Sequence, residues 1–591
     1  MSLVTWICFA LRHLFSIQTT MHPQLVTAGG QHRKGLVMRW LLAALLLVDF
    51  SPASWADDSG GHHHDGGGNS SGPLPGFNPV RPTRGSFEVW LSDQANTVGL
   101  SLSSPTGTHG GKVRIYDSAD LLRPQPINNP IVLDATLDLF PNALQATNSH
   151  TTRLHGIMPS PDFEYMALNF VSSGHLGIVH GPSKQPVCLF RSTGTSTGRQ
   201  NHMSFWTPNG NHIIVGNQNG RMLERVDVIR HTSGAVKEFV FNASSSLDFV
   251  GGSGRVTAQP IAVTMDSSNG IGCRVEGAVP DNQTSLTPAN RPKQAPGIRP
   301  LNSVICPIPS SSGKHVFATL GGGGMFVVDV SASPMAIVAE YDLSIMNAAG
   351  CGGIETQGYM HMDTGTSGAG VSEFSVYRFG VDYPLAPNYL PPNSPLPIAV
   401  WQDPDNGKLL PGNNRDAHGM VVIDDELHVF DRVRNTGDIF HMHEPWNILE
   451  THDSYDLTES QACGTTLGAT TSNDPTPDLG DASPEGDTIF VALRGPFPLT
   501  VSHAAAGSCP GLGIIVRDPI TREWRLAHVL PSTVLDFSGS INLSDPHAVI
   551  VRRNGAAAVP GPLPLLGLGM GLAWSRRLRK RLQKRASQTQ G

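Results

Sequence analysis

The sequence predicts an all-β protein in which seven small antiparallel sheets close into a ring, a seven-bladed β-propeller. Three observations support this fold. One phrase, built from a polar residue, an apolar run and a turn, recurs at steps of roughly 47 to 70 residues, with one longer step of about 101. Each copy precedes further short apolar segments, as strands of one blade would. The first strand-like segment lacks the strand that should precede it in its blade, and the last lacks the strand that should follow it, so the two segments can complete one blade.

The phrase begins with the same kind of residue in five copies. A histidine or aspartate stands six residues before the turn position in each of them: His155 before Pro161, His202 before Pro208, His418 before Asp424, Asp478 before Pro484 and His547 before Arg553. We call this first polar residue the head of the phrase. Two further copies lack a histidine or aspartate at the head. SVICPIPSSSGK places Ser303 six residues before Pro309, and CGGIETQG begins a weaker unit near Cys351. Seven blades result, with eight or six as alternatives.

The segments after each phrase have the composition of buried strands. EYMALNF, HIIVGNQ, HVFATLG, LHVFDRV and TIFVALRG occupy the second position, and GGMFVVDV, GLGIIVRD and KVRIYD occupy the third. The longest step contains an insertion near 253–299, rich in Pro, Ser, Asn and Gly, which we expect to be a surface loop without strands.

The two ends of the propeller predict how the ring closes. FEVWLSDQANTVG, near Phe87, reads as a second strand with no first strand before it, whereas PHAVIVRR at 546–553 reads as a first strand with none after it. Pairing these N- and C-terminal strands in one blade would remove the exposed edges of an open ring.

The turns SPDF, TPNG and SPEG, with strand endings such as FVVDV and RIYD, resemble those of YVTN-type seven-bladed propellers. The resemblance covers the propeller at 85–555. It implies the fold and no particular activity.

Both ends of the chain resemble processing signals. Residues 1–56 read as a signal peptide, with the apolar run WLLAALLLV before a Ser54-Trp55-Ala56 cleavage site, and Met38 is a possible true start. Residues 57–84 read as a low-complexity linker. Signal peptidase is the partner that this leader implies.

The tail at 556–591 has a proline-bounded motif, a short apolar run and a basic cluster. It resembles a PEP-CTERM sorting signal, although Gly561 stands where that family commonly has glutamate. The resemblance implies processing by an exosortase at the envelope, surface or extracellular matrix of a Gram-negative bacterium, with only transient membrane contact through the tail. The alternative is a C-terminal membrane anchor.

Charge and cysteine content limit the possible partners. The net charge is −7, and without the seven basic residues of the tail and the three net positive charges of the leader the domain is close to −17. Such acidity disfavours nucleic acid. Six cysteines remain after the leader and predict disulfides in an exported protein. We favour Cys463 with Cys509 and Cys273 with Cys306, although fifteen connectivities are possible.

The repeated heads predict a metal site. The first strand of a propeller blade is innermost, so His155, His202, His418, His547 and Asp478 should converge at one mouth of the central channel. Imidazole and carboxylate donors suit a divalent transition metal, and we favour copper. The alternative is a set of histidines that bond backbone or line a water-filled channel. Cys351 is either a further donor or, as we favour, a disulfide partner.

Other polar residues near the heads have expected supporting roles. Asp416 and Asp545 each stand two residues before a histidine, and we expect them to orient His418 and His547 from a second shell. Arg494 and Arg415 are candidates for binding an anionic substrate, with salt bridges as the alternative. No catalytic residue is identified by the sequence.

The sequence lacks the motifs of several enzyme and cofactor classes. CxxCH is absent, which disfavours covalent haem, and no nucleotide-binding or nucleophile-elbow motif has a supporting context. Two hypotheses remain: a metal-dependent oxidoreductase, with copper as the favoured metal, acting on a small molecule, and a non-enzymatic surface propeller that binds polysaccharide or protein through its loops. A lactonase-like hydrolase is a third, weaker alternative.

Overall fold

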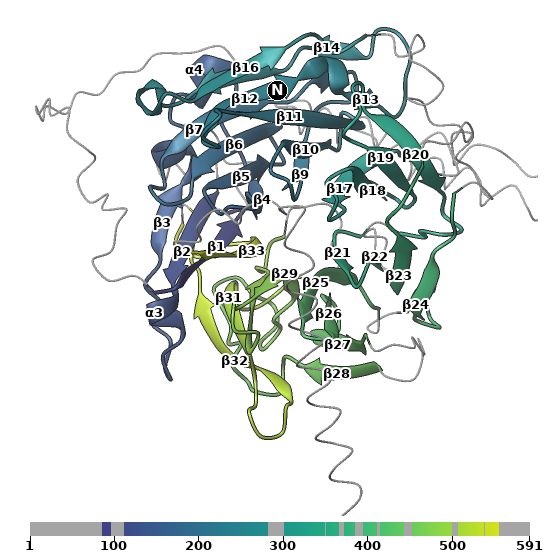
Figure 1. Cartoon of the computed structure of the whole chain (residues 1–591). Helices are drawn as coiled ribbons and strands as arrows, with labels where there is room; N and C mark the ends of the chain where they lie inside the picture. Colours follow the sequence, from purple (N-terminus) through teal and green to yellow (C-terminus); the bar gives the residue numbers. More distant parts are fainter. Residues whose placement is uncertain are drawn as a thin grey trace, which may run out of the picture. The chain divides into compact units, whose positions relative to one another are not determined.

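The computed structural model describes residues 85–95, 111–281, 299, 301–348, 350–365, 371–384, 394–410, 414–442, 452–498, 506–536 and 538–554. These residues form seven antiparallel blades arranged around a central hub (Figure 1). The seven-bladed prediction is therefore confirmed. The predicted leader, linker and sorting tail lie outside the described residues. No helix in the described part of the chain has the length and apolarity needed to cross a membrane.

Each blade runs from an inner strand at the hub to an outer strand. Blades 1 to 3 are β4 (Leu154–Pro159), β5 (Tyr165–Phe170), β6 (His175–His180) and β7 (Pro186–Arg191); β9 (Asn201–Trp206), β10 (His212–Asn217), β11 (Met222–Arg230) and β12 (Val236–Asn242); and β17 (Ser303–Pro309), β18 (His315–Gly321), β19 (Met325–Asp329) and β20 (Ala336–Tyr341).

The next three blades follow the same order. Blades 4 to 6 are β21 (Gly353–Thr356), β22 (Tyr359–Gly365), β23 (Phe374–Gly380) and β24 (Ile398–Gln402); β25 (Ala417–Ile423), β26 (Glu426–Asp431), β27 (Thr436–His441) and β28 (His452–Asp456); and β29 (Pro477–Ala482), β30 (Thr488–Leu493), β31 (Gly511–Arg517) and β32 (Trp524–Pro531). Short helical turns connect strands elsewhere: α3 (Ser118–Leu121), η2 (Ala135–Leu139), α4 (Ala143–Thr147), η3 (Ala243–Ser245) and η4 (Ser267–Asn269).

Blade 7 joins the two ends of the propeller. Its strands, from the hub outward, are β33 (Pro546–Arg553), β1 (Phe87–Asp93), β2 (Lys112–Asp117) and β3 (Ile131–Asp134). β33 pairs antiparallel with β1, with Glu88 opposite Arg552, and the yellow and purple strands lie side by side in Figure 1. The predicted closure is confirmed.

A buried ion cluster crosses this closure. Glu88 of β1 accepts hydrogen bonds from Lys184 Nζ at 2.8 and 2.7 Å and from Arg552 Nη1 at 3.2 Å. Lys184 belongs to the β6–β7 turn of blade 1, and it also lies 5.2 Å from the centre of the Trp90 ring. One carboxylate therefore joins β1 and β33 of the closing blade to the neighbouring blade.

The insertion differs from the prediction, because it contains strands. β14 (Val256–Ala258) pairs with β8 (Gly194–Thr195), β15 (Ile261–Thr264) extends blade 1 beside β7, and β16 (Gly272–Glu276) pairs parallel with β12 of blade 2. β13 (Leu247–Asp248) adds to β11. β15 and β16 cover the outer edges of blades 1 and 2, which would otherwise present unpaired backbone groups, and this explains why short, weakly patterned sequences form strands here.

Three disulfides link separate parts of the ring. Cys463–Cys509 forms as predicted, but the predicted Cys273–Cys306 pair is wrong. Cys273 lies in β16, which packs near β7, and it bonds to Cys188; Cys306 lies in the inner strand β17 and bonds to Cys351. The fold of the insertion places Cys273 beside Cys188. Three disulfides indicate an oxidising compartment.

Candidate metal centre at the hub

The five predicted head residues meet at the hub, which we define as His155, His202, His418, Asp478 and His547. Ring centroids lie 3.4 Å apart for His155 and His547, 4.3 Å for His155 and His202, and 5.7 Å for His418 and His547. Asp478 Oδ1 lies 3.0 Å from His418 Nε2, and Asp478 Oδ2 lies 3.8 Å from His547 Nε2. His202 is half-buried and the other four are buried.

A β-bulge directs each of these side chains to the hub. The pairing register of the inner strand shifts across His155, across His202 and Met203, across His418 and Gly419, across Asp478 and Leu479, and across His547 and Ala548. A bulge adds an unpaired residue and turns its side chain away from the regular alternation. The repeated phrase therefore encodes a repeated bulge.

Blades 3 and 4 supply no donor of this kind. In β17 the shift spans Ile305 and Cys306, so Ile305 is the structural counterpart of His202. The head assigned to Ser303 is wrong by two residues, because the turn begins at Ser310, which bonds to His315 as Thr207 bonds to His212. β21 pairs with β22 without a shift. The donors come from the other five blades.

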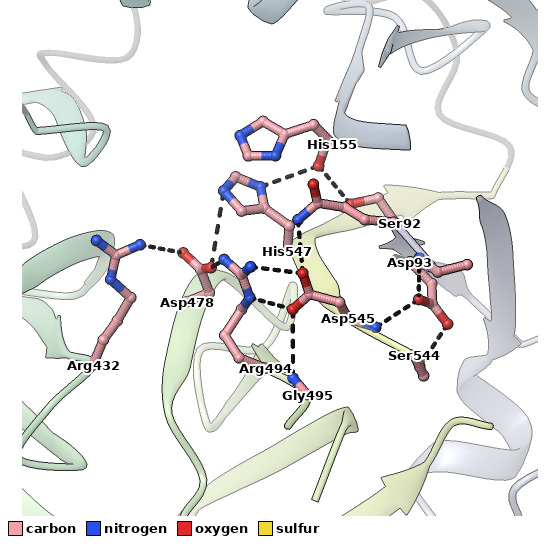
Figure 2. Close-up of polar contacts among 12 residues, drawn as sticks. Ser92, Asp93, His155, Arg432, Asp478, Arg494, Gly495, Ser544, Asp545 and His547 are labelled. Atoms are coloured by element: carbon pink, nitrogen blue, oxygen red, sulfur yellow. Dashed lines mark hydrogen bonds and ion pairs between the residues drawn. The ribbon is translucent and has the colours of Figure 1, made fainter. Parts of the chain in front are cut away.

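His547 has an assigned proton. Its Nδ1 donates to the carbonyl oxygen of His155 at 3.1 Å, and the same carbonyl accepts from Ser92 Oγ at 2.7 Å (Figure 2). A carbonyl only accepts, so Nδ1 carries the proton and Nε2 presents a lone pair. That lone pair faces a carboxylate of Asp478, which is also an acceptor. A cation between the two groups would satisfy both.

His155, His202 and His547 are neutral and Asp478 is ionised. Burial lowers the pKa of His547 to about 3 and that of His202 to about 4, and burial with the neighbouring His547 holds the pKa of His155 well below its ordinary value. Burial raises the pKa of Asp478, but His547, Arg494 and Arg432 outweigh it, and the net pKa is lowered. Neutral imidazole and carboxylate are the forms that ligate metals.

Arginines hold the Asp478 carboxylate in place. Arg494 Nη1 donates to Asp478 Oδ2 at 2.6 Å, and Arg432 Nη1 lies 3.8 Å from Asp478 Oδ1 (Figure 2). Arg494 is paired in turn with Asp545 at 2.6 and 2.8 Å, and Arg432 with Asp416 at 2.9 and 2.8 Å. Both guanidinium groups are buried.

These pairings differ from the predicted supporting roles. The carboxylates of Asp416 and Asp545 bind the guanidinium groups of Arg432 and Arg494. Arg415 is bound to Asp431, Asp438 and Asp403 at 2.7, 2.7 and 3.3 Å. Arg494 and Arg415 thus serve as buried ion-pair partners, and we do not retain them as binders of an anionic substrate.

Arg432, which lies beside Asp478, is a residue of this site that was not predicted from the sequence. It directly follows β26, just as Arg494 directly follows β30. This shared position after consecutive second strands, in LHVFDR and TIFVALR, is a repeat signal that could have identified it.

The geometry divides the hub into two groups. One donor atom each from His418, Asp478 and His547 lie within 4.8 Å of one another. Two imidazoles on one ion, with metal–nitrogen bonds of about 2.1 Å, have ring centroids about 5 Å apart. The 5.7 Å separation of His418 and His547 fits this value, whereas the 3.4 Å stack of His155 on His547 does not. The primary donor set is therefore His418, Asp478 and His547, with His155 and His202 beside it.

Gly419 keeps the bulged strands in contact, and its substitution by alanine should separate them. A Cβ at this position would lie 2.3 Å from the backbone oxygen of Asp478 and 3.0 Å from the Phe430 ring. We expect Gly419→Ala to lower the free energy of unfolding by about 1–3 kcal/mol in urea titrations. Gly380→Ala is the control, because a Cβ there meets nothing within 4 Å. Equal stability of the two variants would contradict this account of the bulge.

No family model and no curated protein matches the chain. Among solved structures, it is similar to the Pseudomonas aeruginosa periplasmic gluconolactonase at 12% identity and a TM-score of 0.41, over 79% of this chain and 99% of that one. A putative 6-phosphogluconolactonase from Bacteroides uniformis gives 12% identity and 0.40, over 79% and 99%. The dihydro-heme d1 dehydrogenase NirN gives 11% and 0.39, over 81% and 78%. Similarities at this level assign no activity.

Proposed function

We propose that this chain is an exported propeller whose hub binds one divalent transition-metal ion through His418, Asp478 and His547, and that it is a metal-dependent oxidoreductase acting on a small molecule. The observation that carries the proposal is the approach of two acceptors, the Nε2 lone pair of His547 and the carboxylate of Asp478, inside a buried site. Without a cation this approach would be unfavourable.

The donor set also suits catalysis. Two imidazoles and one carboxylate leave at least one coordination position for water or substrate, which distinguishes catalytic from closed structural sites. Copper is our first candidate, because imidazole donors suit it and copper has the highest affinity in the divalent series.

Export is part of the same proposal. It is supported by the three disulfides together with the leader and tail motifs. We propose sorting by an exosortase to the envelope or matrix, where polysaccharide is a possible partner. Deletion of residues 556–591 should move the protein from the cell surface to the periplasm or medium. Fractionation of cells that express the full or the truncated chain measures this change.

Metal content tests the hub directly. The mature chain, isolated without a polyhistidine tag and dialysed after loading with Cu²⁺ or Zn²⁺, should retain about one equivalent by elemental analysis, and a His418→Ala/His547→Ala variant should retain almost none. His212→Ala is the matched control, since His212 bonds to Asp227 in blade 2. Retention below about 0.2 equivalents in the unaltered chain, or unchanged retention in the double variant, would reject the site.

The oxidoreductase assignment needs a separate measurement. Loaded protein should consume oxygen or an artificial electron acceptor in the presence of small reduced substrates, and the His418→Ala/His547→Ala variant should not. Stoichiometric metal without turnover across such a panel would leave a metal-binding propeller and remove the enzymatic assignment.

A further inference from the structure

A second group of metal-competent side chains lies at the edge of the hub. One ring nitrogen of His202 and the sulfur atoms of Cys306 and Cys351 lie within 4.8 Å of one another. His202 comes from β9, Cys306 from the bulge of β17, and Cys351 lies two residues before Gly353, the first residue of β21. Both sulfurs are buried in the disulfide that joins blades 3 and 4.

The protonation of His202 provides an independent indication of a ligand. Its ring bonds to the backbone of Ile305. Nδ1 is buried and has no hydrogen-bond partner among the residues that the structure describes. The Ile305 carbonyl can only accept, so the ring nitrogen that bonds to it carries the proton. Because Nδ1 has no partner, that nitrogen is Nε2, and Nδ1 presents a lone pair. A buried lone pair without a partner is unfavourable unless a cation or donor meets it.

The disulfide alone cannot supply that cation site, because its sulfurs are not thiolates. Reduction would change the chemistry: the S–S bond breaks, and each sulfur receives one electron and one proton from a dithiol or phosphine reductant, which is itself oxidised by two electrons. Two thiols beside an imidazole then form a donor set that prefers soft or borderline ions, and binding releases the two thiol protons.

We propose that Cys306, Cys351 and His202 form a second metal site that exists only when the disulfide is reduced, and that it takes a thiolate-preferring ion such as Zn²⁺. The site uses none of the three primary hub donors and therefore does not depend on the proposed hub metal. Neither of the other two disulfides belongs to a comparable His-containing group within the described residues.

Zinc stoichiometry in the two redox states tests the proposal. The folded mature chain is incubated with and without a phosphine reductant, which is removed before dialysis against Zn²⁺ under anaerobic conditions. We expect the reduced chain to retain about one more equivalent than the oxidised chain. The Cys306→Ser/Cys351→Ser variant should lose this increment, His202→Ala should weaken its binding, and the Cys463→Ser/Cys509→Ser control should keep it.

A spectroscopic measurement covers the case in which the serine variant does not fold. The unaltered chain, loaded with Co²⁺, should show a sulfur-to-cobalt charge-transfer band when reduced and no such band when oxidised. Alkylation and mass spectrometry identify the opened disulfide.

Three results would overturn the second site: free Cys306 and Cys351 thiols with no extra ion, an increment that survives Cys306→Ser/Cys351→Ser, or a disulfide that opens only when the protein unfolds. The hub is measured on the oxidised chain, so failure of either site is distinguishable from failure of the other.

Discussion

Replacing Glu88 with alanine is expected to lower the free energy of unfolding by about 3–5 kcal/mol. Lys184 and Arg552 are both buried against this carboxylate, and alanine would leave two cations close together in a low-dielectric site. The loss should be large because removing one partner of a buried ion cluster leaves uncompensated charge. Urea unfolding followed by tryptophan fluorescence measures it.

A surface carboxylate provides the control. Glu238 pairs with Arg274 at 2.9 Å, but the Arg274 side chain is 46% exposed, so Glu238→Ala should cost at most about 1 kcal/mol. Equal losses for Glu88→Ala and Glu238→Ala would show that the closure does not depend on the buried cluster. The location of Glu88 also predicts where the ring opens, since Glu88 holds β1 and β33 of blade 7 against blade 1.

Local sequence was sufficient to predict the blades because each blade carries its own turn and strand signals. SPDF, TPNG and SPEG end inner strands, and the second strands that follow are buried along all or nearly all of their length. Closure was predictable for the same reason, because an unpaired first strand at 546–553 and an unpaired second strand near Phe87 complement each other. These features depend on short-range patterns and on the rule that sheet edges be paired.

Errors arose where structure depends on contacts distant in sequence. Pro309 resembles a turn proline and therefore predicts Ser303 as a head, but the backbone bond of Ser310 to His315 places the turn two residues later and Ile305 at the hub. The strands of the insertion form only against the edges of blades 1 and 2, and their position selects Cys188 as the partner of Cys273.

The repeat register predicted which residues gather at the hub, but not how they contact each other. A common position in each blade brings His155 and His547 together, whereas their stacking at 3.4 Å depends on the bulges and on the His155 carbonyl. The arginine pairs were missed because Asp416 and Asp545 precede histidines in sequence yet face Arg432 and Arg494 in space.

The ion proposed for the hub should stabilise the whole propeller, and Asp478→Asn should abolish most of that effect. A ligand that binds only the folded state, at a free concentration about a thousand times its Kd, adds about 4 kcal/mol to the free energy of unfolding. We expect this increment between EDTA-treated and metal-loaded samples of the unaltered chain. Asparagine has nearly the same size as aspartate and can still accept from Arg494, but it removes the negative charge that faces His418 and His547.

Comparing each variant with its own metal-free state separates binding from folding. Asp478→Asn also leaves Arg494 with less compensating charge, so its metal-free form should be less stable than that of the unaltered chain. Only the increase in the free energy of unfolding on metal loading measures binding of the ion. His212→Ala should keep the full increment, because that residue pairs with Asp227 away from the hub. If Asp478→Asn gained as much stability on loading as the unaltered chain, the ion would bind elsewhere, and the acceptor atoms gathered at the hub would need a different explanation.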